Sequence, residues 1–143
     1  MREKILVIDS NPFTLSIIKQ VIESPNYKVL TALDGESGLQ QFHQFQPILV
    51  ILDIMLPNID GWEICRRIRR VSNVPIMIHT ALETQKHILR ALSLGADDYL
   101  VKPVVPEVIQ NRVEAVLNHR AEVEQLWPRR SSRLASYQPV FAG

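Results

Sequence analysis

The sequence predicts a doubly wound α/β fold, in which a five-stranded parallel sheet is covered by helices on both faces. Short apolar runs alternate five times with amphipathic helical patterns. These runs are continuous rather than alternating, which is typical of strands buried on both faces. Because crossovers between parallel strands are right-handed, the helices are expected to cover both sides of the sheet.

Each strand is predicted from a short apolar run that stops at a polar residue or a turn signal. In chain order, the five runs are residues 5–8, 27–32, 48–52, 75–78 and 98–101. The first run, Ile-Leu-Val-Ile, ends abruptly at Asp9. The third, Ile-Leu-Val-Ile-Leu, ends in the same way at Asp53 and is the strongest of the five.

A helix is predicted after each strand from apolar residues at helical spacing. The expected starts are Pro12, the Asp34-Gly35 turn, Gly61, about Thr84, and Pro106. Asn11 before Pro12 is typical of a helix cap followed by proline at the first helical position. In the third helix, Ile64, Cys65 and Ile68 are expected to face inward. Its four arginines are expected on a solvated outer face: Arg66, Arg67, Arg69 and Arg70.

The chain of 143 residues predicts a single domain. Helical periodicity fails beyond Glu124, so we expect a domain over residues 1–124 and a linker or loose tail over residues 125–143. Residues 1–128 hold thirteen bases and fifteen acids, whereas the last fifteen residues hold three arginines and no acid. The mildly acidic body has no electrostatic footprint for nucleic acid.

Cys65 is the only cysteine, which excludes an internal disulfide and a cysteine-based metal cluster. The apolar run before Asp9 is too short for a signal peptide, and no later run approaches the length of a membrane span. We therefore expect a cytoplasmic protein without a membrane partner.

Polar residues stand where four of the predicted strands end. They are Asp9, Asp53, Thr80 and Lys102. Because the carboxyl ends of parallel strands share one edge of the sheet, these side chains are expected to meet there. Carboxylate oxygens suit Mg²⁺, and a lysine with a hydroxyl complements a phosphoryl group. Each residue alone is more often a cap or a solvated strand end, but four aligned strand ends favour a site.

A glycine-rich phosphate loop does not follow the first strand, since Ser10-Asn11-Pro12 contains no glycine. This disfavours a dinucleotide or P-loop site, and the negative charge in that loop disfavours a bound flavin phosphate, so a nucleotide or flavin enzyme is not expected. His79 beside Thr80 is interpreted as a packed strand end rather than as a catalytic base.

Four segments together resemble the receiver domain of two-component response regulators, of which the chemotaxis regulator is the single-domain type. They are residues 5–9, residues 52–61 (LDIMLPNIDG), Thr80-Ala81, and residues 95–103 (GADDYLVKP). The resemblance covers about residues 3–121. It implies a flavodoxin-like (βα)5 domain with strand order 2-1-3-4-5, acting as a signalling switch rather than as an enzyme on an external metabolite.

By this resemblance, Asp53 is the phosphoacceptor for a histidine kinase or phosphotransfer protein. Lys102 would pair with Asp53 and then with the phosphoryl group, while Thr80 would donate a hydrogen bond to that group. Tyr99 would be the switch aromatic, changing the surface formed by the fourth helix, fifth strand and fifth helix. A homodimer through this surface is also implied, and Asp97 resembles a residue that pairs across such a dimer, with Arg90 or Arg112 as its partner.

The implied Mg²⁺ ligands are Asp9, Asp53 and the backbone carbonyl of Met55, and the Lys102-Pro103 bond is implied to be cis. Ser10 departs from the family, which usually carries a second, metal-binding acid at this position. We therefore expect weaker Mg²⁺ binding. The alternative is a degenerate receiver that acts as a phosphorylation-independent interaction module. The sequence names neither the cognate kinase nor the output, and leaves open whether the chain is a stand-alone regulator or part of a longer protein.

Overall fold

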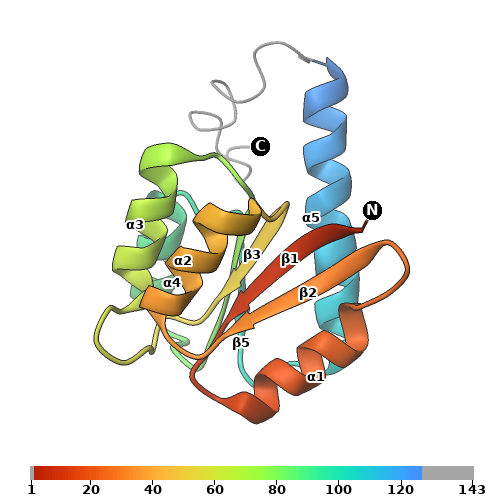
Figure 1. Ribbon diagram of the computed structural model, residues 1–143. Helices are drawn as coiled ribbons and strands as arrows, with labels where there is room; N and C mark the ends of the chain where they lie inside the picture. The colour runs from red at the N-terminus through yellow and green to blue at the C-terminus, as the bar shows by residue number, and fades with distance from the viewer. Residues whose placement is uncertain (1, 127–143) are drawn as a thin grey trace.

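The computed structural model describes residues 2–126, in which five strands and five helices alternate along the chain (Figure 1). The strands are β1 (Glu3–Ile8), β2 (Tyr27–Ala32), β3 (Leu49–Leu52), β4 (Ile76–Thr80) and β5 (Asp98–Val101). The helices are α1 (Pro12–Ile22), α2 (Gly35–Phe45), α3 (Gly61–Val71), α4 (Gln85–Ser93) and α5 (Pro106–Leu126).

All neighbouring strands are parallel, and their order is β2-β1-β3-β4-β5. This confirms the predicted doubly wound fold. The chain moves outward from β1 in one direction to β2, and then in the other direction through β3, β4 and β5. The loops that follow β1 and β3 therefore lie side by side at the carboxyl edge of the sheet, where ligands bind in such folds.

The strand side chains divide between two hydrophobic clusters, one on each face of the sheet. Helices α2, α3 and α4 cover a face that includes Leu6, Val50 and Ile78. Helices α1 and α5 cover the opposite face, which includes Val7 and Ile51. Figure 1 shows this division, with α2, α3 and α4 together on one side of the sheet. Burial on both faces explains why the strands are apolar at consecutive positions.

Polar caps begin the helices where the sequence predicts them. The side chain of Asn11 accepts hydrogen bonds from the backbone of Phe13 and Thr14 at the start of α1. Asp60 accepts one from Glu63 in the same way at the start of α3. Helix α5 continues to Leu126, two residues past the expected boundary, and the rest of the predicted tail lies outside the described residues.

One of the four arginines on α3 is not on a solvated face, and this part of the prediction is wrong. The guanidinium of Arg69 is largely buried and binds Asp97 at 3.0 Å, the carbonyl oxygen of Gly95 at 2.8 Å and that of Val74 at 2.6 Å. Arg69 comes one position after the inward-facing Ile68, so its long side chain reaches around the edge of the helix. It ties the end of α3 to the start of β4 and to the turn before β5.

The same contact involves Asp97, whose pairing across a dimer stays a prediction. Its carboxylate is engaged within the chain, by Arg69 and by the backbone N–H of Ile76. Arg112 pairs instead with Asp98, and Arg90 lies over the ring of Trp62.

Candidate functional site

Four polar residues continue one row of the sheet beyond its apolar part. The residues two positions earlier in each strand all pack beneath α1 and α5: Val7, Ile51, Met77 and Leu100. Because side chains alternate along a strand, the following members of this row face the same side. They are Asp9, Asp53, His79 and Lys102. The strand registers Ile8↔Leu52 and Leu52↔Ile78 place Asp9, Asp53 and His79 as successive neighbours.

Lys102 joins the two carboxylates of this row. Its Nζ lies 2.8 Å from Oδ2 of Asp9 and 2.8 Å from Oδ2 of Asp53. Both carboxylates are buried, with Asp9 2% and Asp53 5% exposed. Burial opposes a charged ammonium, but the hydrogen bonds to Asp53 and Asp9 outweigh it and raise the pKa of Lys102. The site therefore holds two carboxylates and one ammonium, so that one formal negative charge is left over.

The remaining carboxylate oxygens are held by backbone N–H groups of the loops. Oδ1 of Asp9 accepts a hydrogen bond from Asn11, and Oδ1 of Asp53 accepts one from Met55. The loop after Asp53 also packs closely against α3, where a Cβ at Gly61 would overlap the backbone carbonyl of Asp53. Glycine is therefore needed at position 61 to keep the backbone of Asp53 in place.

Thr80 and Tyr99 lie on the other face of the sheet. Thr80 is fully buried and lies two positions after Ile78 in β4, so it faces the same side of the sheet. Ile78 belongs to the cluster beneath α2, α3 and α4. Tyr99 packs against the same cluster, and its hydroxyl donates a 2.6 Å hydrogen bond to the carbonyl of Leu82 in the loop after β4. Burial and the charge of Asp53 raise the pKa of Tyr99, so the phenol is neutral and can donate this bond.

The oxygen donors at this edge suit a hard divalent cation. They carry two negative charges, whereas a site with three acids would carry three. Asp9 and Asp53 supply two carboxylates, whereas Ser10 is an exposed neutral residue. The described residues contain no group of three or more His, Cys, Asp or Glu side chains able to hold a metal. Mg²⁺ needs only one or two protein carboxylates because it keeps several waters. The donor set therefore fits Mg²⁺ with reduced charge.

The model of the response regulator receiver domain family matches residues 5–114. The chain belongs to this family. The match covers Asp9, Asp53, Thr80, Tyr99 and Lys102, and it confirms the resemblance inferred from the four sequence segments. A receiver domain is a signalling domain rather than a conventional enzyme.

Curated relatives of this receiver are transcriptional regulators about twice its matched length. The "Probable transcriptional regulator ycf27" of Guillardia theta is 44% identical over 116 residues, which are 81% of this chain and 46% of that protein. The alkaline phosphatase synthesis transcriptional regulatory protein PhoP of Bacillus subtilis is 38% identical over 124 residues, 86% of this chain and 51% of that protein. The chain thus spans about half the length of these relatives.

A solved receiver domain has the same architecture. The BeF3-activated receiver domain of DrrB, a Thermotoga maritima protein, superposes with a TM-score of 0.76 at 34% identity, covering 82% of this chain and 99% of that one. A CheY-like receiver from Methanospirillum hungatei gives a TM-score of 0.80 at 24% identity, covering 85% and 98% of the two chains, and shows the fold alone.

The structure brings Asp9, Asp53 and Lys102 into contact, while Thr80 is adjacent on the opposite face and makes a long, 3.5 Å contact with the backbone of Leu82. The Lys102-Pro103 bond is cis, as the resemblance implies. Sequence reasoning missed that His79 belongs to the same row. The alternation of side chains along β3 and β4 could have shown it, because Asp53 and His79 each lie two positions after a strand residue that is buried on this face.

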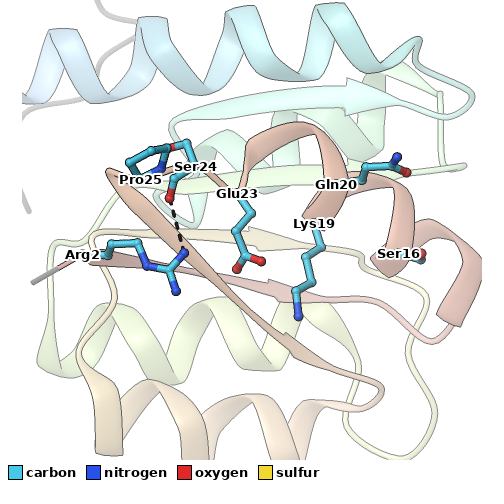
Figure 2. A pocket seen from close by; sticks show the side chains of 7 residues that line it. All are labelled: Arg2, Ser16, Lys19, Gln20, Glu23, Ser24 and Pro25. Carbon is cyan, nitrogen blue, oxygen red and sulfur yellow. Dashed lines mark hydrogen bonds between the residues drawn. The ribbon is translucent and has the colours of Figure 1, made fainter.

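A separate surface hollow lies away from this site, between α1 and the segment before β1 (Figure 2). It is lined by residues that include Arg2, Lys19 and Glu23, and Arg2 donates a hydrogen bond to the carbonyl of Ser24. Arg2 precedes β1 and Ser24 precedes β2, so this part of the hollow lies toward the amino ends of the strands. It therefore does not belong to the row of Asp9 and Asp53.

No described helix is both long enough and apolar enough to cross a lipid bilayer.

Proposed function

We propose that Asp53 of this receiver accepts a phosphoryl group from a phosphohistidine on a histidine kinase or phosphotransfer protein. The observation that carries this proposal is the position of Lys102, whose ammonium contacts both Asp9 and Asp53 at 2.8 Å. Asp53 is thereby a buried carboxylate at the edge of the sheet with a cation already beside it. A negatively charged nucleophile that must approach a negatively charged phosphoryl group requires such a partner.

In the transfer, an oxygen of Asp53 forms a bond to phosphorus as the N–P bond of the phosphohistidine breaks. The bonding electron pair returns to the imidazole nitrogen of the partner. Lys102 stays beside the new group and pairs with its oxygens, leaving Asp9 free of one of its two hydrogen bonds. The protein's contribution is positioning and charge stabilisation, which dominate phosphoryl transfer. The same groups assist the later attack of water that removes the phosphoryl group.

We also propose that Asp9, Asp53 and the backbone carbonyl of Met55 hold Mg²⁺, and that Ser10 weakens its binding. Bound Mg²⁺ supplies positive charge that offsets the repulsion between the carboxylate and the phosphoryl oxygens. Asp9 and Asp53 face each other across Lys102, so they converge on a small volume at the sheet edge. Ser10 offers a neutral hydroxyl where another carboxylate would add a full charge.

The switch proposal rests on Thr80 and Tyr99. Thr80 donates a hydrogen bond to the phosphoryl group, which draws it toward the carboxyl edge. The space beside it is then available to Tyr99, whose hydroxyl bonds the loop between β4 and α4. A local change of charge thus alters the surface of α4, β5 and α5. We include a homodimer through this surface in the proposal, and sedimentation velocity with and without phosphorylation tests it.

Exposed apolar residues flank the proposed phosphoacceptor and support docking of a partner there. Phe13, Met55 and Val105 are 71%, 56% and 62% exposed. Each follows a site residue closely in the chain, so all three lie in loops or helix starts at the carboxyl edge of the sheet. Exposed apolar groups around a polar centre are typical of protein interaction sites.

The test is incubation with Mg²⁺ and a small phosphodonor such as acetyl phosphate, followed by intact mass spectrometry. We expect the mass of one phosphoryl group on the wild type and none on Asp53→Asn. Asp98→Asn serves as the control, because Asp98 begins β5 at the opposite end of the sheet. A mass gain that persists in Asp53→Asn would refute the assignment.

A phosphorylation-independent interaction module is the second candidate. Ser10 is the feature that favours it, because the missing acid reduces the charge available for Mg²⁺. The retained Asp53, Thr80 and Lys102 favour the phosphoacceptor. Absence of any mass gain in the wild type under the same conditions would support the second candidate.

A further inference from the structure

His79 is a buried polar residue without a hydrogen-bond partner. The residue is 5% exposed, and neither ring nitrogen has a partner among the described residues. A buried polar atom left unpaired destabilises the folded state, so such atoms are rare in native proteins. The orphaned ring therefore calls for a role that the unmodified site does not reveal.

The position of the ring points to that role. His79 is the next residue after Asp53 in the row across β1, β3 and β4, and it faces the same side of the sheet. Neighbouring parallel strands are about 4.8 Å apart. Across β5, the register His79↔Leu100 places Lys102 two residues further along the adjacent strand on the same face. The imidazole is thus bordered by the proposed phosphoacceptor on one side and by the strand that carries its lysine partner on the other.

The ring is neutral in this setting. Burial and the nearby charge of Lys102 lower the pKa of His79, against the opposing effect of Asp9 and Asp53. A neutral imidazole carries one N–H donor and one acceptor nitrogen. In the unmodified protein, Lys102 and the backbone N–H of Met55 already serve the two oxygens of Asp53. The donor of His79 has no partner in the described structure, whereas a phosphoryl group would bring three further acceptor oxygens.

We propose that His79 donates a hydrogen bond to the phosphoryl group carried by Asp53, and so acts as an additional binding residue of this receiver. The inference rests on the proposed function, because it requires that Asp53 be modified. Phosphorylation then relieves an unsatisfied polar group as well as engaging Lys102 and Thr80. A leucine or valine at position 79 would pack equally well but could not make this bond, so the histidine would lengthen the life of the phosphorylated state.

The test uses beryllofluoride with Mg²⁺ as a non-hydrolysable probe, titrated by isothermal calorimetry into the wild type, His79→Leu and His79→Gln. Loss of a hydrogen bond to a charged group is expected to weaken binding by His79→Leu about tenfold or more. Gln keeps an N–H donor of similar reach, so His79→Gln should recover much of the affinity. Met77→Leu, on the same strand and face, is the matched control and should bind like the wild type.

A spectroscopic measurement on the wild type removes any dependence on the folding of the variants. In ¹⁵N-labelled protein, the imidazole N–H of His79 should shift downfield and exchange more slowly with water when beryllofluoride is added. The inference is overturned if His79→Leu binds the probe as tightly as the wild type, or if the imidazole signals do not move on saturation. A wild type that binds no probe and gains no phosphoryl mass would instead overturn the proposed function on which this inference stands.

Discussion

Ser10 decides the charge balance of the site at the scale of single residues. Asp9 and Asp53 share the ammonium of Lys102, and Ser10 adds no charge to them. We expect Ser10→Asp to bind Mg²⁺ about tenfold tighter or more. The interaction energy between one carboxylate charge and a nearby dication is on the order of kcal/mol even at an effective dielectric constant of about 20. Calorimetric titration measures the affinity, with Ser16→Asp on the exposed side of α1 as the control. Equal affinities in Ser10→Asp and the wild type would contradict the role of Ser10.

His79 should give the stability of the protein a measurable dependence on pH. Its pKa is lowered in the folded state, mainly by burial, from an ordinary value of 6.5. The folded protein therefore binds fewer protons than the unfolded chain, so its unfolding free energy is largest above about pH 6.5 and falls as the pH drops below that value. Urea unfolding between about pH 8 and pH 5.5 should show a shallower fall for His79→Leu than for the wild type.

The exposed His43 provides the control for this measurement. His43→Leu removes an exposed imidazole instead of a buried one, and we expect it to keep the wild-type slope. Parallel profiles for the wild type and His79→Leu would show that the burial of His79 does not govern the slope.

The residues that meet at the site could be predicted because strand ends are visible in the sequence. Asp9 and Asp53 each end a continuous apolar run, and parallel strands bring such ends to one edge. The sequence did not reveal that His79 is an unpaired member of the same row, because a histidine at a strand end is compatible with packing, capping or catalysis. The register of β1, β3 and β4 is needed to show that His79 lies next to Asp53 on the same face.

At the scale of elements, Arg69 links α3 to the segments that precede β4 and β5. Its guanidinium binds the carbonyl groups of Gly95 and Val74 and the carboxylate of Asp97. Arg69→Met would leave these buried acceptors without their donor, and we expect it to lower the unfolding free energy by about 3 kcal/mol. The adjacent, exposed Arg70 is the matched control, and Arg70→Met should change stability by less than about 0.5 kcal/mol. Similar losses for both variants in urea unfolding would contradict this role.

The starts of the helices could be predicted, whereas the direction of a long side chain could not. Asn11 and Thr84 are recognisable caps, and both perform that function. Arg69 and Arg70 are the same amino acid at consecutive positions of α3. A rotation of about 100° per residue turns one toward the β4 and β5 connections and the other toward water. Which of two neighbouring arginines is buried depends on the tertiary packing of the helix edge.

At the scale of the whole molecule, the polar site and the contacts of Arg69 lie at opposite ends of the sheet. The polar row lies at the carboxyl edge, whereas Arg69 binds the segments where β4 and β5 begin. Both hydrophobic clusters connect these two ends through the same five strands. The charge that we propose to be added at Asp53 therefore lies at the opposite end of the sheet from the contacts of Arg69.

The described residues that form the two clusters extend no further along the chain than Leu117. Beyond it, Arg120 binds the side-chain oxygen of Asn73 at 2.7 Å and its backbone carbonyl. We therefore expect a chain shortened to residues 1–126 to keep the unfolding free energy of the full chain within about 0.5 kcal/mol. A chain shortened to residues 1–117 loses the Arg120 contact and should be about 1–2 kcal/mol less stable. Urea unfolding of the three chains measures this, and a large loss in the 1–126 chain would show that residues 127–143 are part of the folded domain rather than a linker.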